Sequence, residues 1–227
     1  MLKFSERYQS PGDLPQRIPV FPLRGAILLP RATLPLNIFE PRYLQMMEDV
    51  MSTSRVLGMV QPEGGGDEDE SPVGRTVPLR RIGGAGRITG YQEVDGRMLI
   101  TLTGIARFTL VNEVPLEKAY RICTVSYDTF AADFAAGAGE DAVDRHGLLK
   151  ALKVYLEARN LKADWAVVSK SSNESLVNSL AIASPFGAEE KQALLEAADL
   201  KTRAEILVAL AEMELAAGTG SAGSTLQ

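Results

Sequence analysis

Residues 18–24 read IPVFPLR and residues 34–43 read LPLNIFEPRY, and these two stretches decide the fold of the chain. Prolines recur through both and exclude a helix there, because each proline removes a backbone donor and crowds the preceding turn. The apolar residues between them predict two short strands over residues 17–38, with kinks or edge positions in the sheet. Pro41 suits the first turn of a helix, where its missing N–H costs nothing. A helix is therefore expected over residues 41–53, with an apolar stripe of Leu44, Met47 and Met51.

Residues 77–114 carry the clearest strand pattern in the chain. Asp95-Gly96 separates two runs of β-forming residues, and glycine readily takes the positive φ that a tight hairpin turn needs. Gly104 interrupts the second run and predicts a bulge where the sheet curves. Further strands are expected over residues 55–61 and 120–127. Several short strands with one helix predict a small, strongly curved sheet or partial barrel.

The second half of the chain carries helical patterns. One helix is expected over residues 140–160, with an apolar stripe of Leu149, Leu152 and Leu156. Two capping boxes predict where further helices begin, and they consist of Ser171 with Glu174 and Thr202 with Glu205. Ser184-Pro185 ends the first of these two helices, and another helix is expected over residues 188–198. The pattern thus predicts a bundle of about four helices.

The fold class predicted from these patterns is α+β, with an N-terminal curved β-sheet or partial barrel followed by a C-terminal α-helical bundle. Residues 130–139 are rich in alanine and glycine and mark the boundary between the two parts. The expected division of the chain is an N-terminal arm at 1–16, a β-rich subdomain at 17–128, a helical-bundle subdomain at 129–217 and a flexible tail at 218–227.

The composition is typical of a soluble globular protein, with 227 residues of which 45% are hydrophobic and 23% charged. No apolar run approaches the roughly 20 residues that span a membrane. The N-terminal residues show no apolar core of a secretory signal. The single cysteine, Cys123, has no partner for an internal disulfide, as is typical of the reducing cytoplasm. We therefore expect a cytoplasmic protein without membrane association.

The net charge of −5 comes from residues 129–227, which hold 9 basic and 14 acidic residues. Mild acidity disfavours a general nucleic-acid binder, because such proteins usually carry a basic surface. The first half of the chain is rich in arginine but contains only Lys3 and Lys118 as lysines. A contiguous patch of Arg80, Arg81, Arg87 and Arg97 would favour RNA binding, whereas scattered arginines would argue against it.

A search for catalytic and ligand-binding motifs gives no site. The glycine-rich residues 83–86 lack the lysine of a P-loop and lead into a strand, so they are better explained as glycines of a curved strand. The acidic residues 67–70 lack the alternating ligands of an EF-hand. Cys123 and His146 show no metal-ligand spacing, and the dipeptide Ser169-Lys170 is no catalytic dyad. We expect no enzymatic activity, no cofactor and no metal; only a pocket joining Cys123 or His146 to carboxylates would point to an enzyme.

Residues 18–24 and 34–43 resemble the start of the N-terminal domain of Lon proteases, the substrate-binding domain of the ATP-dependent protease La family. The form NIFEPRY is similar to that of the stand-alone bacterial members. Residues 190–200 (EKQALLEAADL) resemble the end of the same domain, so the resemblance covers roughly residues 17–215. It implies a PUA-like β module and a non-catalytic protein that binds unfolded or extended polypeptide, or a protein partner. RNA binding through the PUA-like module is the alternative.

Four residues of the opening motif are the candidate substrate-binding residues: Arg24, Phe39, Arg42 and Tyr43. They are the polar or aromatic residues of the motif that are not evident core residues. The alternative is a structural role. In that case the two arginines pair with Glu40 or with backbone carbonyls, and the two aromatic rings pack the helix onto the sheet.

Overall fold

The computed structural model describes residues 7–64, 77–115, 118–160 and 163–220. The strands are β1 (Arg17–Pro22), β2 (Thr33–Ile38), β3 (Val56–Val60), β4 (Ile82–Val94), β5 (Arg97–Glu113) and β6 (Arg121–Ser126). The α-helices are α2 (Pro41–Met51), α3 (Arg145–Ala158), α4 (Trp165–Lys170), α5 (Asn173–Ala183), α6 (Ala188–Glu196) and α7 (Leu200–Gly220). Short 3₁₀ helices are η1 (Pro11–Asp13), η3 (Asp128–Phe134) and η4 (Glu140–Ala142).

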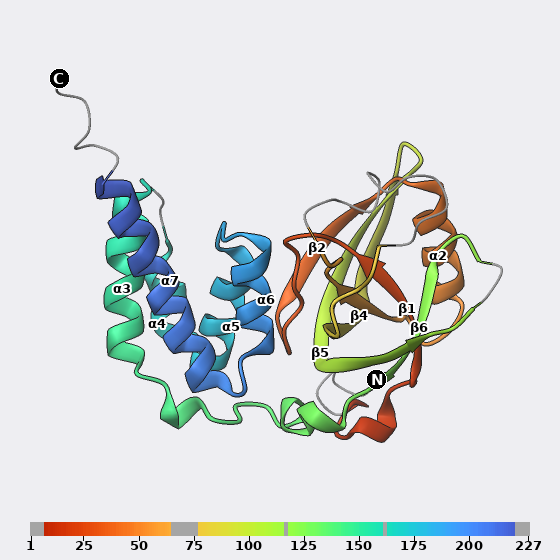
Figure 1. Ribbon diagram of the computed structural model, residues 1–227, viewed down its shortest axis with the longest axis horizontal. Coiled ribbons are helices and arrows are strands. Elements are labelled where there is room, and N and C mark those ends of the chain that lie inside the picture. The colour runs from red at the N-terminus through yellow and green to blue at the C-terminus, as the bar shows by residue number, and fades with distance from the viewer. Residues whose placement is uncertain (1–6, 65–76, 116–117, 161–162, 221–227) are drawn as a thin grey trace.

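Two lobes lie side by side, a β lobe that carries α2 on its outer side and a lobe made of α3 to α7 (Figure 1). The chain crosses from the first lobe to the second through η3 and η4. This architecture confirms the predicted α+β class, with the sheet first and the helical bundle second. The predicted subdomain boundaries themselves stay a prediction.

The six strands form one mixed sheet in the order β2-β5-β4-β3-β1-β6. β6 also pairs with the far end of β5. The strands β5, β4, β3, β1 and β6 are therefore hydrogen-bonded in a closed ring. β1 and β3 are parallel, and the other neighbours are antiparallel. The sheet therefore curls strongly without becoming a regular barrel, which confirms the predicted partial barrel. β2 stands at the edge of the sheet and, in the described part of the chain, pairs with β5 alone.

The long β4–β5 hairpin has the predicted turn. Asp95 and Gly96 both have positive φ, 49° and 73°, as the tight two-residue turn requires. The predicted bulge is also confirmed, because Ala85 pairs with Ala106 whereas Gly86 pairs with Gly104, and the residue between the two partners is extra. The bulge gives this long hairpin the bend that curls the sheet.

Helix α2 ends at Met51, two residues before the predicted end. Its buried residues are Tyr43, Met46, Met47 and Val50. Of the predicted stripe, Met47 is fully buried, whereas Leu44 and Met51 are only partly buried and pack against the same core. The reason is that the ring of Tyr43 packs against Phe21 of β1, with the two ring centroids 4.3 Å apart, and this contact sets the rotation of the helix.

Residues 25–32 form a buried strap between the two lobes. Leu28 packs into the core under α2, whereas Ile27 and Leu29 pack into the core of the helical lobe. The strap is fastened at its end by Arg31, whose guanidinium pairs with the carboxylate of Glu174 in α5. The strap thus contributes to both cores, and this role was not predicted.

The strap explains why glycines gather in residues 83–86. A Cβ built on Gly84 would lie 2.0 Å from the carbonyl oxygen of Leu28, and a Cβ on Gly104 would lie 2.0 Å from that of Leu29. Any side chain at these positions would push the strap off the sheet. The strand interpretation of this glycine cluster holds, and the close approach of another backbone is its physical reason.

The helices begin at caps other than the predicted ones. Ser172, not Ser171, accepts a hydrogen bond from the Ser175 amide and starts α5. The predicted capping box fails because the Glu174 carboxylate is held by the strap and by the amide of Gly137. The box at Thr202 is likewise wrong, because α7 begins at Leu200 and Asp199 accepts from the Thr202 amide at 2.8 Å.

Other helix boundaries also differ from the prediction. The stretch 140–160 divides into η4 and α3, and Leu148, Leu152 and Tyr155 form the buried face of α3. Helix α4 was not predicted. Helix α7 continues to Gly220, so its last residues fall in the predicted tail, and the rest of that tail lies outside the described residues. Helix α5 ends at Ala183, as Ser184-Pro185 predicts.

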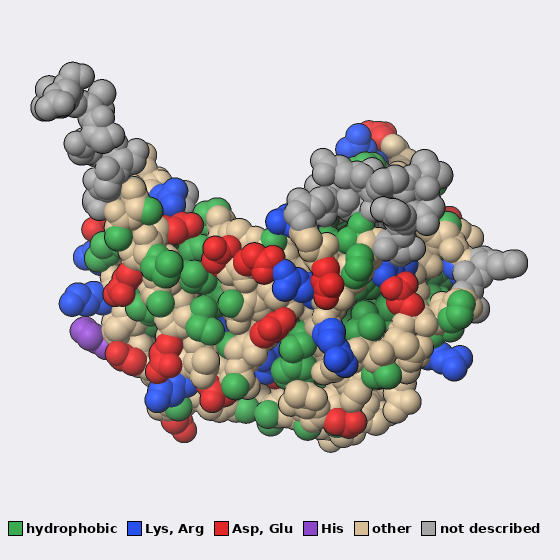
Figure 2. Space-filling model, viewed as in Figure 1, with side chains coloured by type: hydrophobic (Ala, Val, Ile, Leu, Met, Phe, Trp, Pro, Cys, Tyr) green, Lys and Arg blue, Asp and Glu red, His purple; other side chains and the backbone are tan. Residues whose placement is uncertain are grey.

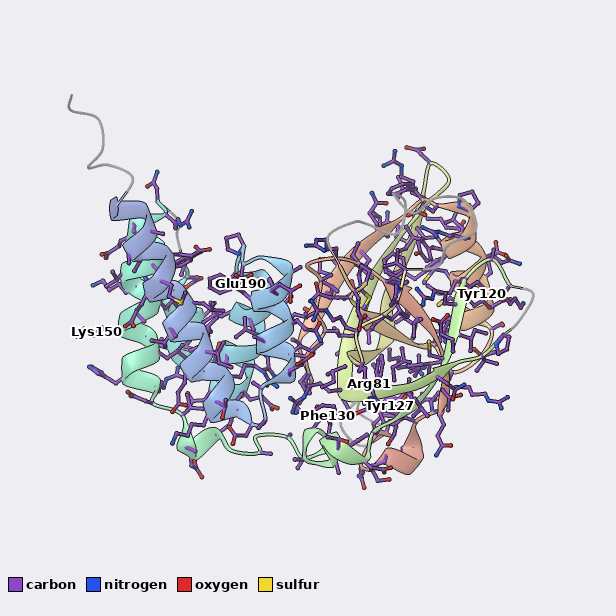
Figure 3. All side chains as sticks on the ribbon, in the orientation of Figure 1. Arg81, Tyr120, Tyr127, Phe130, Lys150 and Glu190 are labelled. Carbon is purple, nitrogen blue, oxygen red and sulfur yellow. The ribbon has the colours of Figure 1, made fainter. Side chains whose placement is uncertain are left out.

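Arg107 in β5 joins the two lobes. Its side chain is 3% exposed and donates to both carboxylate oxygens of Asp133 in η3, at 2.8 and 2.9 Å. It also donates to the carbonyls of Leu195 and Ala197 at the end of α6. The guanidinium lies 4.3 Å from the ring centroid of Phe130, which Figure 3 labels in the segment between the lobes. One side chain therefore ties together β5, the connecting segment and α6.

The segment before β1 adds to the β core, because Tyr8 and Leu14 are buried there. Among the described helices, none combines the length and the apolar character needed to cross a membrane.

Candidate functional site

A groove of about 430 Å³ lies between β2, the start of α2 and the chain that leaves β1. All four predicted site residues line it. The full lining is Phe21, Pro22, Leu23, Arg24, Pro35, Leu36, Asn37, Ile38, Phe39, Glu40, Arg42, Tyr43 and Pro62. The two halves of the opening sequence motif, residues 18–24 and 34–43, therefore line the same surface groove.

Tyr43 and Arg42 take structural roles in this groove. The ring of Tyr43 is 4% exposed and packs on Phe21, and the Arg42 guanidinium lies 4.5 Å from the Tyr43 ring centroid. Arg42 also pairs with the carboxylate of Glu40 at 2.8 Å. The structural alternative therefore accounts for both residues, and they shape the floor of the groove.

Phe39 is different, because 59% of its surface is exposed. It stands between the end of β2 and the first turn of α2, and Pro41 begins the helix just after it. The Arg97 guanidinium lies 5.7 Å from the Phe39 ring centroid, and no packing role in the core accounts for the ring. Leu23, which lines the same groove, is also exposed, at 37%. These two side chains offer apolar surface to a ligand.

Arg24 also lines the groove. Its guanidinium donates to the backbone carbonyl of Gly64, and its side chain is half-buried. Within the described residues no carboxylate pairs with it. Among the described residues, the groove therefore presents one arginine that forms no ion pair.

A second hollow of about 430 Å³ adjoins the groove on the other side of β2. It shares Pro35, Leu36 and Asn37 with the groove and continues over the β4–β5 hairpin to the exposed side chains of Tyr91 and Leu99. The phenol of Tyr91 donates to the carboxylate of Glu93, which raises the pKa of the phenol. Strand β2 thus runs between two adjoining concave surfaces.

The residues weighed for catalysis do not come together. Cys123 is fully buried in β6, and burial raises the pKa of its thiol to about 11. His146 lies exposed on α3 in the other lobe. The hydroxyl of Ser169 donates to a carbonyl of its own helix. In the described part of the chain no three His, Cys, Asp or Glu side chains are grouped to hold a metal ion, and residues 67–70 lie outside that part.

The four arginines considered for RNA binding are scattered. Arg80 pairs with Glu189 of α6, and Arg87 donates to the N-terminal segment and to the loop after α2. Arg81 precedes β4, whereas Arg97 lies at the opposite end of that strand, across from Val94. Figure 2 likewise shows basic side chains interspersed with acidic and apolar ones on the visible face. These four arginines therefore do not form the contiguous patch that would favour RNA binding.

A curled sheet with an edge groove, fastened to a helical bundle, defines a class of small two-lobed domain. The family model of the ATP-dependent protease La (LON) substrate-binding domain matches residues 17–212, and the chain belongs to this family. This confirms the resemblance carried by the opening motif.

The proteins with similar sequences include Lon proteases. The chain is 26% identical over 201 residues to "Lon protease" of Flavobacterium johnsoniae, with 85% of this chain and 23% of the relative covered. It is 27% identical over 209 residues to "Lon protease 2" of Myxococcus xanthus, with 87% and 24% covered. The chain therefore spans about a quarter of the length of these relatives.

Two solved structures share the fold. One is a Lon N-terminal domain protein from Xanthomonas campestris, with a TM-score of 0.57, 23% identity and coverage of 85% of this chain and 97% of that one. The other is the N-terminal domain of Lon protease from the Mycobacterium avium complex, with a TM-score of 0.61, 16% identity and coverage of 86% and 98%.

Proposed function

We propose that this chain is a non-catalytic, cytoplasmic module that binds unfolded or extended polypeptide in the groove beside β2. The observation that carries the proposal is the exposure of Phe39, an aromatic side chain that is 59% exposed on a groove also lined by the exposed Leu23. Membership of a substrate-binding domain family supports the same function. The module holds a polypeptide and adds no chemistry of its own, and a protein partner with an extended segment is a ligand of the same kind.

The proposal predicts that truncating Phe39 weakens binding of an unfolded polypeptide. We expect wild-type protein to bind a fluorescently labelled, permanently unfolded polypeptide saturably by fluorescence anisotropy. Phe39→Ala is expected to raise Kd about tenfold, because an exposed aromatic anchor that becomes buried on binding contributes more than about 1 kcal/mol. Apolar contacts predict a Kd that changes little with salt.

Val167→Ala is the matched control, because Val167 is an apolar side chain of similar exposure on α4, in the other lobe. It is expected to leave Kd within about twofold of wild type. Absence of saturable binding, or equal losses in both variants, would contradict the proposed function.

A further inference from the structure

Within the part of the chain that the structure describes, strand β2 pairs along one edge only, and the hydrogen bonds of its neighbour show which residues face the other, free edge. The amide of Gly104 donates to the carbonyl of Ala32, and the amide of Arg31 donates to the carbonyl of Gly104, both at 2.9 Å. Both backbone groups of Gly104 therefore point toward the β2 side. Backbone groups of successive residues alternate in direction along an antiparallel strand. It follows that Leu102, Ile100 and Met98 also point toward β2.

The hairpin turn gives the same assignment independently. The two-residue turn closes on the pair of Val94 with Arg97, which in this type of hairpin is a hydrogen-bonded pair. Arg97 therefore directs its backbone groups toward β4, and so do Leu99 and Thr101. The residues between them, beginning with Met98, face β2.

The register of β2 on β5 then separates its residues into two sets. Leu34, Leu36 and Ile38 lie opposite Leu102, Ile100 and Met98, so their backbone groups are used within the sheet. Thr33, Pro35 and Asn37 direct their backbone groups to the other side, and no described backbone group is bonded to them there. This free edge offers three carbonyls but two amides only, because Pro35 has no N–H.

The spacing of these free groups matches an extended chain. Alternate residues of a strand repeat at about 6.6 Å, and a second strand presents its own donors and acceptors at the same interval. The side chains of Thr33, Pro35 and Asn37 are exposed, and Pro35 and Asn37 line both hollows that flank the strand. A proline on an edge strand hinders uncontrolled pairing but leaves its own carbonyl available.

We propose that an extended polypeptide segment docks as an added strand along this free edge, bonded to the backbone of Thr33 and Asn37. This inference rests on the proposed function and names the form in which the polypeptide binds. An apolar side chain of the segment lies between Phe39 and Leu23, and an acidic side chain balances the charge of Arg24 on the same groove. Main-chain bonds supply affinity with little demand on sequence, as strand addition to a sheet edge does elsewhere.

The test removes one free amide without disturbing the sheet. The probe is a short fluorescent peptide of alternating valine and threonine with a single aspartate. Asn37→Pro deletes the outward N–H and keeps the bonds of Leu36 and Ile38 to β5, and Asn37→Ala is the control that retains the N–H. We expect Asn37→Pro to raise Kd about tenfold and Asn37→Ala to change it less than twofold.

Two further measurements keep the inference testable if Asn37→Pro folds poorly. Pro35→Ala supplies the missing amide and is expected to tighten binding a few-fold. N-methylation of the peptide at one set of alternating amides is expected to weaken binding strongly, and methylation at the other set to have little effect.

The outcomes separate this inference from the proposed function. If the peptide binds and Phe39→Ala weakens it, while the proline, alanine and N-methyl changes leave Kd unaltered, then the groove binds polypeptide but strand addition is wrong. If no polypeptide binds, both fail. Pro35→Ala could instead cause self-association, measured by sedimentation velocity, without tighter peptide binding. The edge of β2 would then pair with a second copy of the chain, and this result would also overturn the inference.

Discussion

Lys191 is a buried cation in the helical lobe, 4% exposed. Its ammonium donates to the carbonyls of Ala181 and Ile182 in the last turn of α5. The last carbonyls of a helix have no amide of the same helix to accept from, so Lys191 caps the end of α5. Burial lowers the pKa of the amine to about 8. Lys191 thus stabilises the end of α5, but keeping its charge away from water costs free energy of folding.

This arrangement predicts a stability that rises in alkaline solution. The folded pKa is lower than that of the unfolded chain, so between about pH 8 and 10 the unfolded state binds more protons, and raising the pH favours folding. We expect wild type to gain on the order of 2 kcal/mol relative to Lys191→Met over this range, measured by urea unfolding at successive pH values. Parallel pH profiles for the two proteins would show that Lys191 titrates normally.

At the scale of elements, the strap at residues 25–32 and the glycines of β4 and β5 form one packing unit. Gly84→Ala is expected to lower the free energy of unfolding by at least about 2 kcal/mol, because the added Cβ meets the Leu28 carbonyl at 2.0 Å. Gly12→Ala is the control, since its Cβ would meet only the Ser10 hydroxyl at an ordinary 3.8 Å. Urea unfolding measures both, and equal stability of the two variants would mean that the strap yields without cost.

The sequence predicted those elements whose cause is local. The β4–β5 hairpin follows from Asp95-Gly96, and the start of α2 follows from Pro41, since each residue restricts its own backbone. The cap of α5 was missed by one position because a distant group, Arg31, engages Glu174. The full burial of Tyr43 on α2 was missed for the same reason, as contact with Phe21 decides it.

The candidate site was predictable in part. The motif residues Arg24, Phe39, Arg42 and Tyr43 do line one groove, although their role in binding stays a prediction. The prolines predicted kinks or edge positions for these strands, but which strand keeps a free edge was not predicted, because it depends on which strand pairs with which. Pro35 was the available signal, since proline within a strand is confined to edges. Arg107 also had a signal that went unused, a charged residue inside the apolar strand run IARFTL at residues 105–110.

At the scale of the whole molecule, the two lobes are held by a buried ion pair as well as by apolar contacts. Arg107 and Asp133 are almost fully buried, and the Asp133 carboxylate also accepts from the Arg107 amide. The Arg107 guanidinium bonds to Asp133 in η3 and to two carbonyls at the end of α6, so the pair fixes how β5, η3 and α6 sit together. Arg80 and Glu189 also join the lobes, but they lie at the surface.

This difference in burial predicts very different costs for breaking the two pairs. Arg107→Met is expected to destabilise the protein by about 3–5 kcal/mol, because it leaves the buried Asp133 carboxylate without its paired guanidinium and two buried carbonyls without their donor. Arg80→Met is expected to cost less than about 1 kcal/mol, since exposed pairs contribute little. Urea unfolding of both variants makes the comparison.

A double-mutant cycle shows whether the loss comes from the stranded carboxylate. Asp133→Leu combined with Arg107→Met should cost less than the two single changes added together, by more than about 1 kcal/mol, because neither charge is then left alone. Amide hydrogen exchange should meanwhile accelerate in η3 and at the end of α6, where Arg107 bonds to Leu195 and Ala197. Strict additivity, with exchange unchanged in both segments, would mean that apolar packing of the strap alone orients the lobes. Non-additivity in the cycle, together with faster exchange in η3 and at the end of α6 only, would instead show that Arg107 and Asp133 fix the orientation of the two lobes.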